Sequence, residues 1–389
     1  MTKYMDILKK NAMLIILVLV YIFFTIMTGG SMFSPMNFNA LITQNAYVFI
    51  LATGMLMCML TGGNIDLSCG SFVCILGAVG GIMMVVKEYG TGVSIIAMLV
   101  VGIIYGCVLG FLVAYVDIPP WIATLAGYLA FRGWGTALLS ANSSTGSISP
   151  FPEAFLKIFS GRVFETAINQ FNVVCLVAGI IASVIVVVTS FMSRANKVKK
   201  GYEAESMTAV IVKSVLAVAA IMLFAYKLAL AGGIPTVLIW VVIIVLIYNF
   251  ITSKTTLGRY FYTIGGNKEA TRLSGVDTRK IMFFAYLNMA VLTVISSYIV
   301  VARFQAANST AGNYYEMDAI AACVVGGVSA YGGSGTVFGM VVGATLIGVI
   351  NLGMSLMGVN ADWQKIVKGG VLLGAVVFDI LAAKKNATK

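Results

Sequence analysis

Long runs of apolar residues alternate with short polar segments along almost the whole chain. Each run is close to the roughly 20 apolar residues that an α-helix needs to cross a bilayer, so the pattern predicts about twelve membrane-spanning helices. We expect these helices near residues 12–29, 39–61, 67–86, 92–116, 120–140, 171–192, 208–230, 233–252, 280–302, 317–331, 335–357 and 364–383.

The composition supports a membrane protein and excludes a soluble enzyme. Hydrophobic types make up 60% of the 389 residues and charged types only 10%, whereas a soluble domain averages about 25% charged. The chain has no histidine, and its six cysteines all lie in apolar runs, so we expect no disulfide, metal site or cofactor. The fold class is therefore all-α and polytopic, with one transmembrane domain over residues 1–389.

The distribution of basic residues predicts the orientation of the chain. The formal net charge is +11, and lysines and arginines flank the spans, as the positive-inside rule requires. If the spans alternate from a cytoplasmic N-terminus, the two densest basic loops, 193–207 and 253–279, both lie inside, and so does the C-terminus. The largest external loop is 141–170. Its amphipathic stretch Glu153–Phe159 either caps helix ends or belongs to a docking surface.

The basic loop between residues 252 and 280 is far longer than the 2–8 residues or so that a connector between helices needs. Asn267 is a natural N-cap, Glu269 in the first turn suits the helix dipole, and Gly275 is a good C-terminal stop. We predict a short helix over 267–274, entered through a flexible Gly265–Gly266 pair. We expect Ala270, Leu273 and Val276 to pack to one side.

Two interpretations of this helix remain open on pattern alone. It either lies in the lipid headgroups or forms a rigid knob for a pocket on a cytoplasmic partner. Its charges and its single bulky aliphatic residue would anchor it only weakly in a membrane, which favours the second interpretation.

The segment GRYFYTIGGNKEATRLSGV resembles the coupling-helix region of permeases of the ribose/xylose-type ABC sugar importers. TGGNIDLSCGSFV at 61–73 and VVGGVSAYGGSGTVFG at 324–339 resemble two further motifs of that family, in the same order. An inserted Asn64 and an additional apolar stretch beside a charged loop at 194–205 are similar to the xylose and multiple-monosaccharide branch.

The resemblance implies a permease subunit of the prokaryotic cytoplasmic membrane that passes a xylose-, arabinose-, glucose- or galactose-like sugar. It implies a separate ATPase subunit, an extracytoplasmic sugar-binding protein and a second permease copy as partners. The residues that it implies for coupling to the ATPase are Gly265, Gly266, Asn267, Lys268, Glu269, Ala270, Arg272, Leu273, Ser274 and Gly275.

The two glycine-rich segments interrupt apolar runs in both halves of the chain, and broken helices in corresponding halves often mark a translocation path. Close helix packing explains the same glycines equally well. The candidate path or gate residues are Asn64, Asp66, Ser68, Ser71, Gly326, Gly327 and Ser329. For Asp66, capping of the helix that starts near Leu67 is a compatible second role.

Most other ionisable residues near spans, among them Lys227, Glu316 and Asp318, lie within a turn of a predicted end, where snorkelling explains them. Arg132 lies well inside its span, and we expect it to pair with a carboxylate or to face a wet cavity.

No Gly-x-x-x-x-Gly-Lys-Ser/Thr motif occurs, so this chain has no phosphate-binding loop of that type and is not itself the ATPase. An ion-coupled secondary transporter of a small polar solute is the alternative. It would usually place an acidic pair at mid-span, which the sequence does not show.

Overall fold

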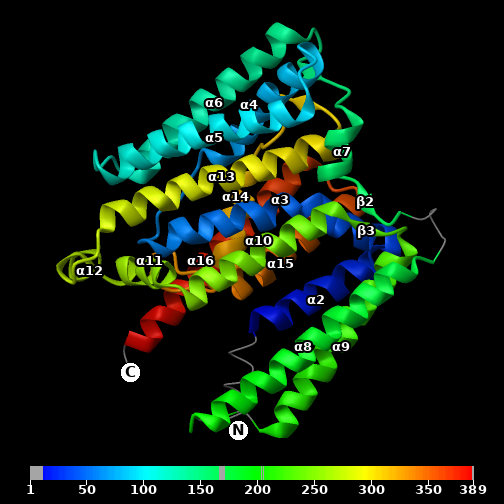
Figure 1. Ribbon diagram of the computed structural model, residues 1–389, viewed down its shortest axis with the longest axis vertical. Coiled ribbons are helices and arrows are strands. Elements are labelled where there is room, and N and C mark those ends of the chain that lie inside the picture. The colour runs from blue at the N-terminus through cyan, green and yellow to red at the C-terminus, as the bar shows by residue number, and fades with distance from the viewer. Residues whose placement is uncertain (1–11, 166–170, 203, 205, 388–389) are drawn as a thin grey trace. The chain divides into compact units, whose positions relative to one another are not determined.

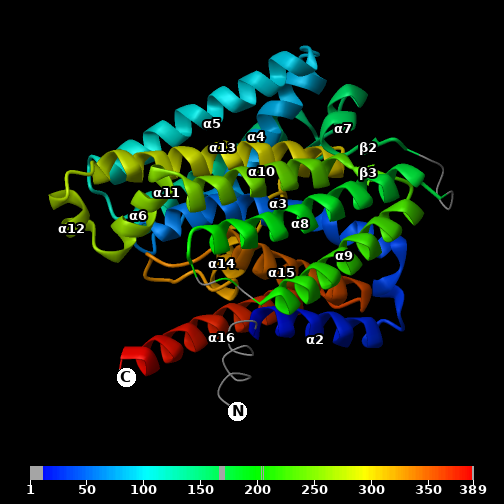
Figure 2. The ribbon, with the colours of Figure 1, turned by 60° about the horizontal axis from the view of Figure 1, so that its bottom comes forward.

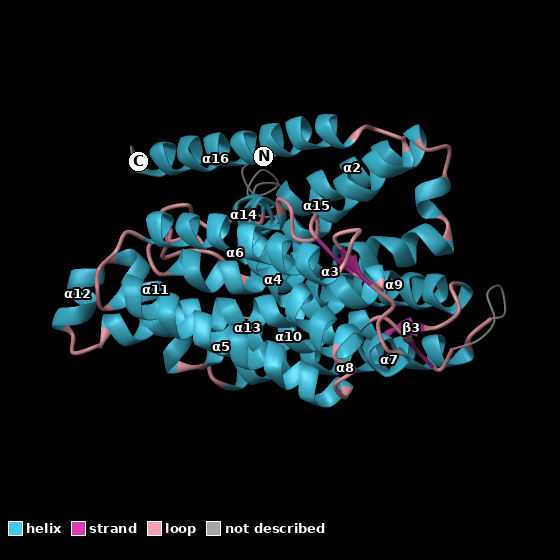
Figure 3. Ribbon diagram, turned by 90° about the horizontal axis from the view of Figure 1, so that it is seen from above, coloured by secondary structure: helices cyan, strands magenta, loops and turns pink. Residues whose placement is uncertain are grey.

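The computed structural model describes residues 12–165, 171–202, 204 and 206–387, and only the backbone beyond residue 377. The basic N-terminal segment 1–11, residues 166–170 of the predicted external loop, Glu203 and Glu205 of the loop 193–207, and the last two residues of the C-terminal tail lie outside the described residues. The described chain is almost entirely helical, with four two-residue strands (Figures 1 and 3).

The long helices are α2 (Ala12–Met27), α3 (Pro35–Leu60), α4 (Cys69–Gly81), α5 (Thr91–Ala114), α6 (Pro120–Asn142), α8 (Val173–Lys199), α9 (Met207–Leu230), α10 (Thr236–Lys254), α13 (Thr278–Phe304), α15 (Val337–Leu356) and α16 (Ala361–Ala387). The short ones are η1 (Ser31–Phe33), the π-helical η2 (Ile82–Val86), α7 (Glu153–Phe159), α11 (Thr256–Gly266), α12 (Lys268–Leu273) and α14 (Tyr315–Val325).

Every apolar run of the sequence contains a helix, and 8 helices among the described residues are long and apolar enough to span a membrane. The span expected at 317–331 is wrong in length. Helix α14 has 11 residues and stops at Val325, because Gly327 takes a left-handed φ of +82° and the chain then turns through further glycines. The count of about twelve spans and the orientation of the termini stay predictions.

The described chain forms two compact units, and the larger comprises residues 12–32, 41–160 and 237–387. Within the described residues its most buried spans are those of α3, α4, α13 and α15, each 72% buried. Helices α4 and α6 pack together, and α5 lies along α13 (Figures 1 and 2). Glycine explains the second contact: a Cβ at Gly102 would lie 2.1 Å from Val294 Cγ2, and Gly106 meets α13 in the same way one turn later.

Helix α7 occupies the predicted bounds Glu153–Phe159, and its buried Phe155 and Phe159 pack on Tyr298 of α13. Beside it, strand β1 (Ser147–Ile148) pairs antiparallel with β4 (Ala307–Asn308), which ties this loop to the chain after α13. Helix α7 therefore packs on the last turns of α13, and whether it also belongs to a docking surface stays a prediction.

The smaller unit, residues 33–40 and 161–236, is a hairpin of α8 and α9. Asn172 caps α8, accepting from Val174 N at 3.0 Å, and strands β2 (Arg162–Val163) and β3 (Ile234–Pro235) pair antiparallel. The prediction that Lys227 snorkels to the surface is wrong, because this residue is only 8% exposed. Its Nζ donates to the Phe33 carbonyl at 2.8 Å and lies 3.7 Å from the centroid of the Phe33 ring.

Candidate functional site

Helix α12 is the short capped helix that the sequence predicts. The Asn267 side chain accepts a hydrogen bond from Ala270 N at 2.9 Å, and the Asn267 carbonyl accepts one from the Thr271 hydroxyl at 2.8 Å. Gly275 takes a φ of +86° directly after the C-cap Ser274, so the helix ends where glycine allows it.

The faces of α12 differ from the expected ones. Thr271 is the buried residue, whereas Ala270 is exposed and Leu273 is 75% exposed. The expectation failed because only one residue of this six-residue helix packs against the rest of the chain, and that residue is Thr271.

Glu269 and Arg272 form an exposed ion pair at 2.5 Å, whose hydrogen bond lowers the pKa of the Glu269 carboxyl. The outer surface of α12 thus presents Lys268, this pair and an apolar leucine.

Gly265 and Gly266 are not a flexible entry, as the sequence suggested, but the last residues of the amphipathic helix α11. Phe261 and Ile264 of α11 are buried in the core that contains the end of α3. A Cβ at Gly265 would lie 2.0 Å from the Leu60 carbonyl oxygen and 2.3 Å from Gly333 N. Gly265 is therefore required for a backbone-to-backbone contact rather than for flexibility.

This contact brings the three sequence motifs together. Gly333 N donates to the Leu60 carbonyl at 3.1 Å, and the Tyr262 hydroxyl of α11 donates to the Gly335 carbonyl at 2.9 Å. A Cβ at Gly63 would lie 2.0 Å from the Ala330 carbonyl oxygen. The segments 61–73, 258–276 and 324–339, far apart in sequence, thus meet at the end of the bundle where α12 lies (Figure 2).

A cleft of about 410 Å³ opens beside this junction. Its walls are the start of the first motif (Thr61, Gly62 and Asn64), the turn 117–120 before α6, and residues 264–268 at the α11–α12 junction. Asn64 donates to both the carbonyl and the hydroxyl of Thr61, at 3.2 and 3.1 Å. The predicted residues Asn64, Gly265, Gly266, Asn267 and Lys268 therefore line one cleft.

Asp66 lies deeper, in the connection between α3 and α4, and is 1% exposed. Its Oδ1 accepts from Ser68 N at 2.8 Å and from the Ser68 hydroxyl at 2.5 Å, and the Tyr105 hydroxyl of α5 donates to Ser68 at 2.6 Å. The N-cap of α4 is Ser68, so Asp66 supports the helix start from two residues before it. Burial raises the pKa of Asp66 to about 6 against the opposing Ser68 hydrogen bonds.

Arg132, half-way along α6, is held by backbone carbonyls rather than by the carboxylate that the sequence suggested. Its Nη1 donates to the carbonyls of Ser309 and Ala311 at 3.0 and 2.9 Å. A Cβ on Gly312 would lie 1.9 Å from the Gly70 carbonyl in the first turn of α4. The non-helical segment 309–314, expected outside the bundle, therefore enters it, and Arg132 satisfies backbone carbonyls that lipid would leave unpaired.

Two acidic residues assigned to snorkelling positions are instead buried. Asp318 is 2% exposed and accepts from the Tyr47 hydroxyl at 2.6 Å, with Lys368 of α16 at 3.0 Å. Glu316 is 1% exposed, and its Oε2 finds no partner among the described residues. The error arose because α14 starts inside the bundle beside Gly70 rather than at a surface.

The remaining predicted residues occupy different surroundings. The Ser71 hydroxyl is buried in α4 without a hydrogen-bond partner among the described residues. Gly326 packs against the Gly339 carbonyl, while Gly327 faces open space. Ser329 accepts from Tyr331 N at 3.1 Å inside the turn before α15. Ser71 thus lies with Asp66 and Ser68, and the other three lie on the third motif.

Comparison with known proteins shows the family of the chain. A family described as the permease component of branched-chain amino acid transport systems matches residues 37–376. The chain belongs to this permease family. It is therefore a multi-pass, non-catalytic membrane subunit of a bacterial ABC importer, which settles the question of an ion-coupled carrier left open by the sequence.

Several similar proteins of known function are sugar permeases. The chain is 35% identical to the xylose transport system permease protein of Haemophilus influenzae over 97% of this chain and 98% of that protein. It is 34% identical to the xylose permease of Escherichia coli K12, covering 97% and 93%, and 30% identical to that organism's ribose import permease, covering 96% and 94%. No solved structure matches the chain.

Proposed function

We propose that this permease imports a xylose-like monosaccharide as one of two identical copies around a shared path. The similarity to two xylose permeases at 34–35% identity, higher than to the ribose permease, supports the substrate. An extracytoplasmic binding protein delivers the sugar, and a cytoplasmic ATPase powers the cycle. Both termini lie on the cytoplasmic side with α12, in keeping with the basic loop 253–279.

The observation that carries the proposal is the contrast between α12 and the end of α11. Helix α12 exposes Leu273 to 75%, while Gly265 near the end of α11 packs directly on the backbone of Leu60 and Gly333. An exposed apolar residue ringed by charges on a short capped helix suits a pocket on a partner protein. We therefore assign α12 as the element that the ATPase grips.

The inner contacts suggest how motion of α12 reaches the path. Close-packed backbone does not compress, so a displacement of α11 is passed on to whatever touches Gly265. These neighbours are the end of α3 and the turn at Gly332–Gly335, and both border the connection that carries Asn64 and Asp66. We propose that this connection, with Ser68 and Ser71, is the gate that the ATPase moves, and that Gly326, Gly327 and Ser329 form its opposing turn.

Bulky substitutions on α12 test the docking role. In proteoliposomes with the ATPase and binding protein, Glu269→Trp and Leu273→Trp should abolish ATP-dependent sugar uptake and weaken ATPase co-purification at least ten-fold. The matched control is Glu153→Trp on α7, which breaks another exposed helical ion pair, with Lys157. Normal uptake by the α12 variants, or an equal loss in the control, would show that α12 is not the docking element.

Substrate identity is tested separately with the unaltered complex. We expect labelled xylose uptake to be blocked by excess unlabelled xylose, and far less by ribose or galactose. Preferential uptake of ribose would contradict the substrate assignment and leave the permease role intact. Cross-linking of the purified complex should yield a permease dimer, and a complex with a single permease copy would contradict the paired arrangement.

A further inference from the structure

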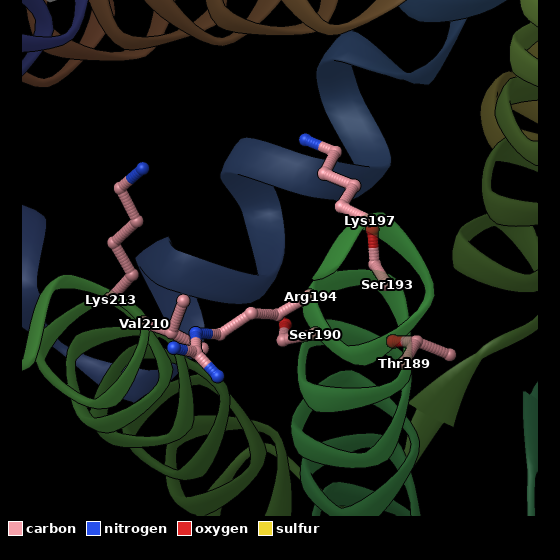
Figure 4. Close-up of a pocket in the computed structure, with 7 residues that line it drawn as sticks. All are labelled: Thr189, Ser190, Ser193, Arg194, Lys197, Val210 and Lys213. Atoms are coloured by element: carbon pink, nitrogen blue, oxygen red, sulfur yellow. The ribbon is translucent and has the colours of Figure 1, made fainter. Parts of the chain in front are cut away.

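Charged side chains on the long helices differ in whether they lie near an opposite charge. The pocket of about 370 Å³ between α8 and α9 is lined by Arg194, Lys197 and Lys213, but the two ammonium groups point away from the Arg194 guanidinium (Figure 4). These cations therefore do not form a common site. The region around segment 309–314 is different, because an arginine and a glutamate lie near each other there.

Arg132 has hydrogen-bonding capacity that this conformation does not use. Its Nη1 holds the carbonyls of Ser309 and Ala311, but its buried Nε and Nη2 have no hydrogen-bond partner among the described residues. The charge of Arg132 also reaches the Cys74 thiol, which is only a weak acceptor. A guanidinium binds a carboxylate best through two nitrogens at once, so the side of Arg132 that suits a carboxylate has no acid on it here.

Glu316 is the acid that matches it. This residue is 1% exposed, and its Oε2 has no hydrogen-bond partner among the described residues. A Cβ at Gly70 would lie 2.0 Å from this oxygen, so the carboxylate lies against the first turn of α4, where the helix dipole favours negative charge. The charges of Asp66 and Asp318 act against the Glu316 carboxylate, and the charge of Arg132 favours it.

Arg132 and Glu316 thus each keep an unpaired charged atom inside the protein, although the opposite charge is within electrostatic range. An unpaired buried charge costs stability, and an ionisable residue at such a position inside a membrane protein usually serves function. Transport needs at least two conformations, which differ where packed elements have two discrete arrangements. Segment 309–314, which holds Arg132 and leads into Glu316, is non-helical and can shift without unwinding a helix.

We propose that Arg132 and Glu316 are positioning residues of the gate, and that they form a direct ion pair in the other conformation of the transport cycle. In the present conformation Glu316 lies at the start of α4. When segment 309–314 and α14 shift, its carboxylate moves to Nε and Nη2 of Arg132 and releases the start of α4. Ser68 and Ser71 lie at that helix start, so the inference rests on the proposed function of these two residues in the gate.

Glu316→Gln tests the pair, because it should change stability and transport in opposite directions. The glutamine keeps the shape of the side chain and removes an unpaired buried charge, so the melting temperature of the purified chain at pH 7.5 should rise. In proteoliposomes with the ATPase and binding protein, ATP-dependent xylose uptake should fall at least about ten-fold, because the other conformation loses its ion pair. A residue needed only for structure would lower both quantities.

The matched control is Asp318→Asn, which neutralises another buried carboxylate on α14. The Asp318 carboxylate already has partners in Tyr47 and Lys368, so its removal should lower the melting temperature. A melting temperature of Glu316→Gln that does not rise, or normal uptake by this variant, would overturn the proposal.

A double-mutant cycle tests whether the two residues act on each other. Arg132→Lys should lower uptake about five-fold in the unaltered chain but at most about two-fold in the Glu316→Gln chain, because the effects of paired residues do not add. Additive losses would show that the residues act separately and would also overturn the proposal. If the unaltered complex imports no sugar, the proposed function fails instead, and the melting temperatures still test the pairing.

Discussion

Gly265 lies where the coupling element meets the rest of the molecule. Its neighbours are backbone atoms of α3 and of the third motif, not flexible side chains that could move aside. The next glycine, Gly266, has open space where a Cβ would be. Of these two adjacent glycines, only Gly265 is required by packing, because a side chain there would collide with backbone atoms.

This difference predicts a matched pair of variants. Gly265→Ala should shift α11 away from Leu60 and cost about 1–3 kcal/mol of stability, as overpacking does. ATP-dependent uptake should fall at least ten-fold. Gly266→Ala should leave uptake within two-fold. Proteoliposome uptake and thermal unfolding of the purified chain measure both effects. Equal behaviour of the two variants would remove Gly265 from the mechanism.

The pKa of Asp66 makes a prediction about pH. Burial raises the pKa from its ordinary 3.8 to about 6, so the carboxyl holds its proton more tightly in the folded chain than in the unfolded chain. The stability from the protonated form is fully present below pH 3.8 and is lost as pH rises through about 6. Asp66→Asn keeps an acceptor for Ser68 without the charge. It should therefore raise the melting temperature relative to the unaltered chain at pH 7.5 and much less at pH 4.5. The same difference at both pH values would contradict the assignment.

At the scale of elements, the capping of α12 connects sequence to function. A six-residue helix has few internal hydrogen bonds, so its order depends on the Asn267 cap and on the carbonyl that Thr271 contacts. The exposed pair Glu269 and Arg272 adds little, because solvent screens it. The cap, not the ion pair, keeps α12 in shape for its partner.

Asn267→Ala should lower the stability of α12 by about 1 kcal/mol, whereas Asn267→Ser keeps a capping oxygen. Hydrogen exchange at the amides of residues 269–274 should quicken about five-fold in the alanine variant and stay near normal in the serine variant. If both variants exchange like the unaltered chain, the cap is not what orders this helix.

At the scale of the whole molecule, the entry of segment 309–314 into the bundle organises the larger unit. It places the start of α14 beside the start of α4 and buries Glu316 and Asp318. Arg132 holds the segment by its carbonyls from the middle of α6. Two helices therefore begin inside the protein, the arrangement in which transport proteins commonly form their paths.

Arg132→Gln should weaken this arrangement, since hydrogen bonds from a charged group are worth about 1.5–3 kcal/mol. We expect a lower melting temperature and reduced uptake, with Arg132→Lys intermediate. Arg259→Gln, on the exposed face of α11, serves as the control. Unchanged melting of Arg132→Gln would mean that the segment is held in place by its other contacts.

The sequence by itself determined the class of protein, the positions of most helices and the capped helix α12. These features depend on local information: apolar runs about as long as a bilayer is thick, the N-cap Asn267 and the stop at Gly275. The three motifs and their order were also readable, because each consists of neighbouring residues.

Only the tertiary structure decided what those residues touch. The closeness of Gly265 to Leu60 and Gly333, the carbonyl partners of Arg132 and the burial of Glu316 all join positions separated by long stretches of chain. Hydropathy reports how apolar a residue's neighbours in sequence are. It does not report which distant segment of the chain packs against that residue in the folded structure. For that reason the half-length helix α14 and the inward segment before it resembled an ordinary span and loop until the packing was seen.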